Sequence, residues 1–172
     1  MSFEDLVVTP TGCRFRGRLF PCSIGWGGVT RTKREGDGAT PTGAHRLIAM
    51  TYRADRMVCP TRSKTSALPA RPTRLDDIWS DDIADARYNS GLRSSTYPYS
   101  HERLWRSDPL YDLVIMTDWN WPDAVPGHGS AIFLHQWRSP GYPTAGCVAF
   151  SRSDLRRIVR WLSPRSRLIV QP

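Results

Sequence analysis

The sequence contains no apolar run long enough to cross a membrane. A membrane-spanning helix needs about 18 consecutive apolar residues, and here charged residues or prolines interrupt every such window. Residues 1–8 also lack the basic stretch followed by an apolar stretch that marks a secretory signal peptide. Neither a membrane span nor a signal peptide is therefore predicted. A cytoplasmic location, export by another route and a start further upstream stay open as alternatives.

Cysteine is scarce, and its spacing does not suit a metal. The four cysteines, Cys13, Cys22, Cys59 and Cys147, form no Cys-x-x-Cys pair, so a structural zinc site is not expected. Cys13 and Cys22 flank a predicted strand and can pair in an oxidising compartment, but two buried free thiols are the favoured interpretation. No Gly-Lys-Ser/Thr follows the glycine-rich stretch 36–43, which excludes a phosphate loop. We therefore predict neither a metal nor a cofactor.

Acidic residues are outnumbered by basic ones, and the net charge is +8. The excess is densest in residues 151–172, which contain six basic residues and one acidic residue. Such a balance suits an anionic partner, such as nucleic acid, a membrane surface or a wall polymer, although a solvated basic face is the simpler interpretation. The sequence has neither the aromatic and glycine pattern of an RNA-binding sheet nor zinc-finger spacing. No nucleic-acid partner is therefore predicted.

Proline and glycine are abundant, with 14 and 13 residues, and they predict many turns. Between the turns, apolar runs and apolar–polar alternation predict strands at residues 3–8, 13–24, 44–52, 111–119, 131–137 and 167–171. The clearest helix covers residues 151–162. It opens on a capping pair, Ser151 and Asp154, and carries one apolar stripe made of Leu155, Ile158, Val159 and Leu162. The pattern predicts a mainly antiparallel β domain with one packed C-terminal helix.

Residues 53–110 are the least regular part of the chain. They contain five prolines and one weak helical pattern, at residues 75–86. An irregular segment of this length is usually a lid or a binding loop. We therefore expect a lid or insertion within a single domain that spans residues 1–172. Tyr88 and Asn89 lie in this segment and are candidate substrate-binding residues.

A histidine and a cysteine stand at the ends of a short Pro- and Gly-rich loop. The strand 131–137 carries His135 near its end, and the loop leads to Thr-Ala-Gly-Cys at residues 144–147. Gly146 allows a sharp turn before Cys147, and the amides there can face a developing oxyanion. A thiol needs an activator, for which imidazole is the usual group. Alone this pair is weak evidence for catalysis, since a buried structural cysteine and a hydrogen-bonded histidine are the more common interpretation of such residues. Zinc binding by His128, His135 and Cys147 is disfavoured because a good fourth ligand is lacking.

The same residues resemble the signature of the YkuD-type L,D-transpeptidases, in which a histidine and a spacer precede Ser/Thr-x-Gly-Cys and an aliphatic residue. Here these are His135 and Thr-Ala-Gly-Cys-Val at 144–148. Upstream, Lys-Arg-Glu-Gly-Asp-Gly-Ala-Thr-Pro-Thr-Gly at 33–43 resembles the family's Lys-x-Gly-Asp-x-x-Thr-Pro-x-Gly loop. The resemblance covers the chain outside residues 53–110. It implies a β-sandwich or barrel-like catalytic domain with Cys147 as nucleophile and His135 as base.

The resemblance also implies positioning roles for Thr144 and Gly146 around the oxyanion. From the residues themselves, the aromatic side chains of Trp137 and Tyr142 suit the wall of a sugar–peptide groove, although buried packing explains them equally well. The group that orients His135 stays open between Asp118, Asn120 and a backbone carbonyl.

In function, the resemblance implies a monomer that acts on peptidoglycan stem peptides in the periplasm or cell envelope. Its donor would be a tetrapeptide ending in meso-diaminopimelate–D-alanine, its acceptor a diaminopimelate amine, and its product a 3→3 cross-link. Two departures suggest a short, divergent member, for which a 1→3 link is an alternative: Ala149 stands where typical members have Arg, and Gln136 where many have Gly. Hydrolysis by an L,D-carboxypeptidase or amidase with the same site is a further alternative. A non-catalytic wall-binding domain is another, against which the intact motifs argue.

Overall fold

The structure is a computed structural model that describes residues 2–61 and 68–172. Within these residues ten strands form one main sheet. From end to end the strands are β3 (Arg18–Phe20), β2 (Gly12–Phe15), β1 (Leu6–Thr9), β15 (Arg167–Val170), β7 (Gly43–Tyr52), β12 (Leu113–Thr117), β13 (Phe133–Gln136), β14 (Val148–Phe150) and β4 (Cys22–Ser23), with β8 (Ala70–Pro72) beside β7. Most neighbours are antiparallel, but β1–β15, β13–β14 and β7–β8 are parallel.

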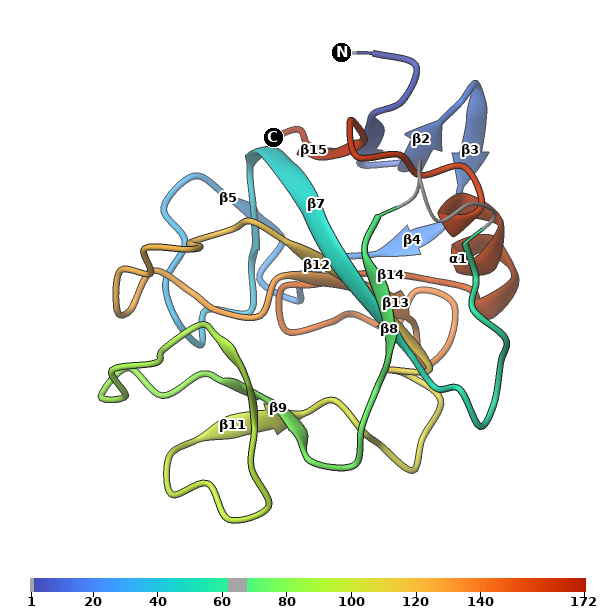
Figure 1. The fold of residues 1–172 in the computed structure, drawn as a ribbon. Helices are drawn as coiled ribbons and strands as arrows, with labels where there is room; N and C mark the ends of the chain where they lie inside the picture. Colours follow the sequence, from blue (N-terminus) through green and yellow to red (C-terminus); the bar gives the residue numbers. More distant parts are fainter. Residues whose placement is uncertain (1, 62–67) are drawn as a thin grey trace.

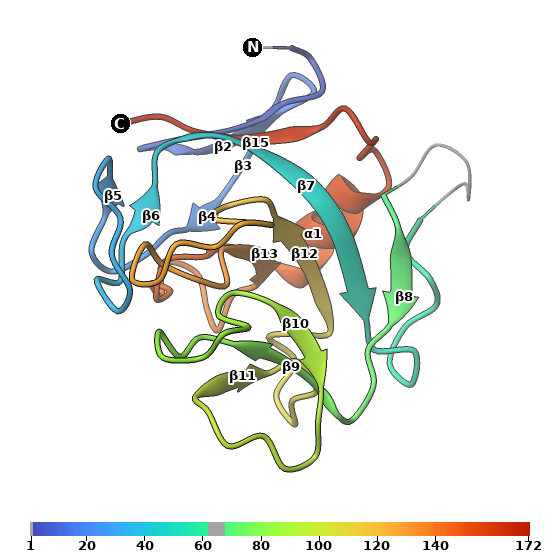
Figure 2. The same cartoon turned by 60° about the vertical axis from the view of Figure 1, so that its left-hand side comes forward.

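The sheet is nearly closed on itself. Its two ends, β3 and β4, are separated along the chain by Pro21 alone, so the ends must lie close together. The result is a barrel-like sheet, with both chain termini at one side of it (Figures 1 and 2). The expectation of a mainly β domain with one C-terminal helix is confirmed.

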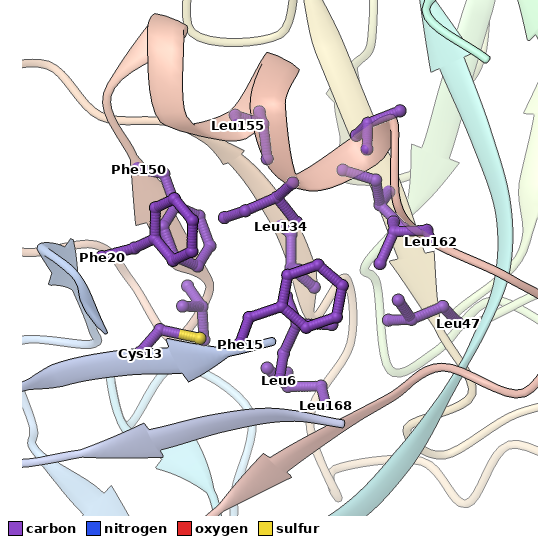
Figure 3. Packing of buried hydrophobic residues seen from close by; sticks show 14 of the residues in the cluster. Leu6, Cys13, Phe15, Phe20, Leu47, Leu134, Phe150, Leu155, Leu162 and Leu168 are labelled. Carbon is purple, nitrogen blue, oxygen red and sulfur yellow. The ribbon is translucent and has the colours of Figure 1, made fainter. Parts of the chain in front are cut away.

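The central strands are buried on both faces. Along β12, Leu113 and Ile115 belong to one apolar cluster, whereas Val114 and Met116 belong to a second. This division follows from the alternation of side chains across a strand. The first cluster packs against the helix and is drawn in Figure 3. The second lies between the main sheet and a smaller one.

Helix α1 (Arg152–Val159) forms where its stripe and its cap predict it. Ser151 is the N-cap, and its hydroxyl accepts a hydrogen bond from the Asp154 amide at 3.0 Å. Leu155 and Ile158 are fully buried in the first cluster, where each contributes about 1.5–3 kcal/mol relative to exposure. Within the described residues, no helix is long and apolar enough to span a membrane.

Two of the predicted elements are wrong. The single strand expected at 13–24 is three strands, because positive φ angles at Arg16 (49°) and Gly17 (76°) turn the chain between β2 and β3 and Pro21 follows β3. The helical pattern at 75–86 contains a strand instead, β9 (Asp77–Ser80). Its pairing with a strand on each side overrides a weak local preference.

The segment 53–110 contains a small sheet at the end of the molecule away from the termini (Figure 2). In this sheet β9 lies between β10 (Gly91–Arg93) and β11 (His101–Arg103). A further short parallel pair, β5 (Val29–Thr30) and β6 (Thr40–Pro41), frames the glycine-rich loop. Residues 62–67 of the expected lid lie outside the described residues, and its role as a lid stays a prediction.

Cys13 and Cys22 are not joined by a disulfide. Cys13 is fully buried in the first cluster, and Cys22 packs against that cluster while partly buried. Burial raises the pKa of the Cys22 thiol to about 11. Both thiols are free, as the favoured interpretation expects and the alternative of a bridge does not, but only Cys13 is buried, whereas Cys22 is half-buried.

Candidate active site

Cys147 and His135 line one cavity of about 180 Å³. The parallel pairing of β13 with β14 brings them there. His135 lies opposite Ala149, so Cys147, two residues earlier, is on the same face of the sheet. Hollows of about 650, 420, 390 and 230 Å³ are larger, but no histidine is among their described lining residues. The smaller cavity is therefore the candidate active site.

The Cys147 thiol is held by two backbone groups. It donates a hydrogen bond to the Ala131 carbonyl at 3.1 Å and accepts one from the Phe133 amide at 3.3 Å. The residue is 9% exposed. Burial raises the pKa of this thiol to about 12, and the charge of Glu102 acts in the same direction. The Cys147 side chain is therefore a neutral thiol in the resting protein.

The imidazole of His135 is oriented by a backbone carbonyl. Its Nδ1 lies 2.7 Å from the Gln136 carbonyl oxygen. A carbonyl only accepts, so Nδ1 carries the proton and Nε2 is left as an acceptor. Burial lowers the pKa of His135 to about 4. The ring is thus a neutral base at physiological pH.

The two other candidates for orienting His135 are engaged elsewhere. Asp118 binds the Arg46 guanidinium at 2.8 Å. The Asn120 amide nitrogen donates to the carbonyls of Val125 and Gly129, both at 3.0 Å. The open choice made from the sequence therefore resolves to the backbone carbonyl.

Thr144 stabilises the turn that precedes Cys147 through two hydrogen bonds of its hydroxyl. Its hydroxyl donates to the Cys147 carbonyl at 2.6 Å and accepts from the Gly146 amide at 3.1 Å. Gly146 has φ of +138°, and a Cβ there would lie 2.9 Å from the Ala39 carbonyl oxygen. Both the hydroxyl and the glycine are therefore needed for this turn. Because the Gly146 amide is engaged within the turn, the Cys147 amide is the better candidate for an oxyanion.

The upstream motif packs against the same turn. Thr40 is fully buried, donates to the Gly146 carbonyl at 2.8 Å and accepts from the Gly25 amide at 2.9 Å. Gly25 in turn forms a bridge with Thr144. Two motifs that lie about a hundred residues apart in the sequence thus form one structure, since Thr40 and Gly146 are 106 positions apart.

An ion pair fixes the rest of the upstream loop. The buried Lys33 ammonium donates to Asp37, whose carboxylate also accepts from the amides of Arg34 at 2.7 Å and Ala39 at 2.9 Å. Burial opposes ionisation of Asp37, but these hydrogen bonds, led by that of Lys33, outweigh it and lower the pKa of the carboxyl. The loop carries the charge pair as a structural element.

Tyr88 and Asn89 do not line the cavity. Tyr88 is buried, and its hydroxyl donates to Glu35. Asn89 is also buried, and its side-chain oxygen accepts from the Ala131 amide at 3.0 Å. Since the Ala131 carbonyl accepts from the Cys147 thiol, Asn89 is linked to that thiol through one residue.

Trp137 and Tyr142 do line the cavity. Trp137 also lines a second hollow, of about 230 Å³, together with residues 9–12 and 140–141. One indole therefore separates two adjoining depressions. Tyr142 is 49% exposed at the rim.

Sequence reasoning missed several residues of the cavity, among them Glu102 and Tyr111. The Tyr111 ring meets His135 edge-on at 5.1 Å between centroids, and its hydroxyl donates to Glu102 at 2.5 Å. Glu102 is the one glutamate among the acidic residues of 53–110, but the residues around it do not indicate a cavity, because its place depends on the pairing of β11 with β9. Within the described residues, no group of three or more His, Cys, Asp or Glu side chains is arranged to hold a metal ion.

Comparison with protein-family models matches residues 14–170 to YkuD, the L,D-transpeptidase catalytic domain. No curated protein and no solved structure gives a significant match. The family match covers nearly the whole chain and includes both motifs around the turn.

Proposed function

The chain belongs to the YkuD family of L,D-transpeptidase catalytic domains, and on that premise we propose that it cross-links peptidoglycan stem peptides through an acyl-enzyme on Cys147. The observation that carries the proposal is the shared cavity of Cys147 and His135, with a neutral imidazole whose Nε2 is an acceptor. A thiol and a base in one partly closed cavity are the elements of nucleophilic acyl transfer.

The first half of the reaction acylates the enzyme. His135 Nε2 takes the thiol proton as Sγ attacks the carbonyl carbon of the diaminopimelate residue that precedes D-alanine. The Cys147 amide stabilises the oxyanion of the tetrahedral intermediate. The C–N bond then breaks, the imidazolium gives its proton to the departing D-alanine nitrogen, and a thioester remains on Cys147.

The second half transfers the acyl group. The amine of an acceptor diaminopimelate attacks the thioester carbon, loses a proton to His135, and forms the new amide as the C–S bond breaks. The proton on His135 then returns to the sulfur. With the thiol pKa raised and the imidazole pKa lowered, this proton resides on sulfur between turnovers.

Two features support transfer over hydrolysis. Trp137 borders both the cavity of Cys147 and the hollow next to it, which offers separate places for donor and acceptor. The net charge of +8 suits an anionic wall polymer. Location in the cell envelope follows from the family and belongs to the same proposal.

The cross-link type is proposed as 3→3, with 1→3 as the alternative. Ala149 occupies the position of the usual Arg and is fully buried, beside His135 on one strand and Ser23 on the other. An arginine at this fully buried position would have to displace its neighbours. A substrate contact made by that Arg in typical members must therefore be made by another residue here or be lost.

The test is incubation of the protein with purified disaccharide-tetrapeptides, with product masses as the readout. Dimeric muropeptides are expected, and tandem mass spectrometry identifies the bond. Cys147→Ala and His135→Ala should abolish or strongly reduce turnover, by about 10² to 10⁴ fold for the base, whereas Cys59→Ala should not. If tripeptide forms without any dimer, the protein is a carboxypeptidase rather than a transpeptidase. Binding without any product would favour a wall-binding domain.

A further inference from the structure

Glu102 places a carboxyl group inside the cavity that holds Cys147. It lies on β11, where its Cα pairs with that of Trp79, and its side chain lines the cavity from the side of the small sheet. One of its oxygens accepts the hydrogen bond from Tyr111. Among residues 2–61 and 68–172, no basic side chain forms an ion pair with Glu102. A neutral hydroxyl is thus its partner in the resting protein.

The two arginines that line the cavity with Glu102 interact with other groups. Arg106 binds Asp108 through Nε at 3.0 Å and Nη2 at 2.7 Å, and its guanidinium lies over the Tyr111 ring at 5.2 Å. Arg138 is exposed, with its guanidinium 5.0 Å from the Tyr142 ring centroid. The cavity therefore has positive charge at its rim and an unneutralised acid within it.

A carboxylate in this place works against the nucleophile. Its charge opposes formation of the Cys147 thiolate. Burial itself also disfavours the ionised acid and raises the pKa of Glu102, a direction that Asp81 and Glu35 reinforce and that the Tyr111 bond and Arg106 oppose. A glutamine would make the same hydrogen bond with Tyr111 at no such cost. The acid is thus explained by a cation that arrives with the substrate.

We infer that Glu102 is the subsite for the side-chain ammonium group of the donor's diamino acid. The inference rests on the proposed function. The donor is the source because the residue whose carbonyl meets Sγ brings its own side chain into the cavity, whose volume of about 180 Å³ suits one such chain. The ammonium also has to be present before acylation to relieve the thiolate, whereas the acceptor arrives afterwards. Binding of the correct donor then activates the nucleophile.

The first experiment measures binding without turnover. Calorimetry on Cys147→Ala compares the disaccharide-tetrapeptide with the same compound N-acetylated on the diaminopimelate side chain. Acetylation is expected to weaken binding at least about tenfold, as for loss of a charge-assisted hydrogen bond. When Glu102→Gln is combined with Cys147→Ala, the affinities for the free and the acetylated compound should lie within about twofold of each other. When Asp123→Asn, an exposed change of equal charge, is combined with Cys147→Ala instead, the preference for the free compound should remain. Equal affinities in Cys147→Ala, or a preference that survives Glu102→Gln, would overturn the subsite.

The second experiment measures the nucleophile directly. At one pH, iodoacetamide should alkylate Cys147 faster in Glu102→Gln than in the unmodified protein or in Asp123→Asn. In the unmodified protein, acylation at saturating donor should be faster with the free-ammonium donor than with the acetylated donor. Equal alkylation rates in all three proteins would contradict the inference. The proposed function and the proposed subsite can fail separately. If both donors acylate the protein at the same rate, the function stands and the subsite is rejected. An ammonium preference in binding with no acylation keeps the subsite and removes the function.

Discussion

Replacing Thr40 by valine tests whether the two motifs form one structure. Valine has nearly the shape of threonine but no hydroxyl, so the Gly25 amide and the Gly146 carbonyl, both buried, lose their shared partner. Leaving a buried group unsatisfied costs about 1–3 kcal/mol. Two such groups, partly relaxed, give an expected loss of about 2–4 kcal/mol. In a domain of this size that corresponds to a fall in Tm of about 4–16 °C.

Calorimetric and circular-dichroism melts of the variant measure this loss, and Thr40→Ser is the control because it retains the hydroxyl. The acylation rate with tetrapeptide donor should fall along with the Tm, since the Gly146 carbonyl belongs to the turn that presents the thiol. If the valine variant melts within about 1 °C of the serine variant, equivalent to under about 0.5 kcal/mol, then Thr40 does not connect the motifs and the reasoning fails.

Four further predictions concern the same site. Gly146→Ala puts a Cβ against the Ala39 carbonyl in a positive-φ backbone, so acylation should fall at least about tenfold, and a full rate would show that the turn tolerates a side chain. Because burial lowers the pKa of His135 to about 4, the neutral base persists until pH falls to that value, and rapid-quench acylation rates should decline near pH 4; a decline near the ordinary 6.5 would refute this. At neutral pH, iodoacetamide should modify the exposed Cys59 before Cys147, whose thiol pKa is raised to about 12, and peptide mapping in the reverse order would contradict the resting state inferred for the site. Amide hydrogen exchange should be faster in residues 138–143, which are all exposed, than in β9, and equal protection would count against a mobile rim.

The elements that the sequence predicted well are those whose signal is local. The apolar stripe and the Ser151 cap specify α1 without reference to the rest of the chain, and the runs at 111–119 and 131–137 place β12 and β13. The shared location of Cys147 and His135 could also be expected from the sequence, because both belong to motifs with fixed residue types; their catalytic roles stay a proposal. The environment of these two residues could not be predicted from the sequence, since their burial and their perturbed pKa values depend on how the sheet closes.

The elements that were missed depend on distant pairing. The alternating arginines of 13–24 fit one long strand, and only the backbone at residues 16–17 shows that the chain turns back. The weak helical pattern at 75–86 gives way to β9 because two partner strands are available. Glu102 enters the cavity through the same pairing, and Thr40 acquires its role only when its loop docks on a turn that lies far along the chain.

The second apolar cluster also limits how the enzyme can open. Trp79 of β9 and Leu104, which directly follows β11, share this cluster with Cys147. Swinging the small sheet outward would return both side chains to water at about 1.5–3 kcal/mol each, which gives an open population on the order of 10⁻² to 10⁻⁴. At equilibrium the sheet is therefore a fixed wall, and a mobile lid would have to come from other parts of 53–110. For the proposed reaction, the exposed segment 138–143, which lies between His135 and Cys147 in the chain, is then the expected route for exchange of substrate and product.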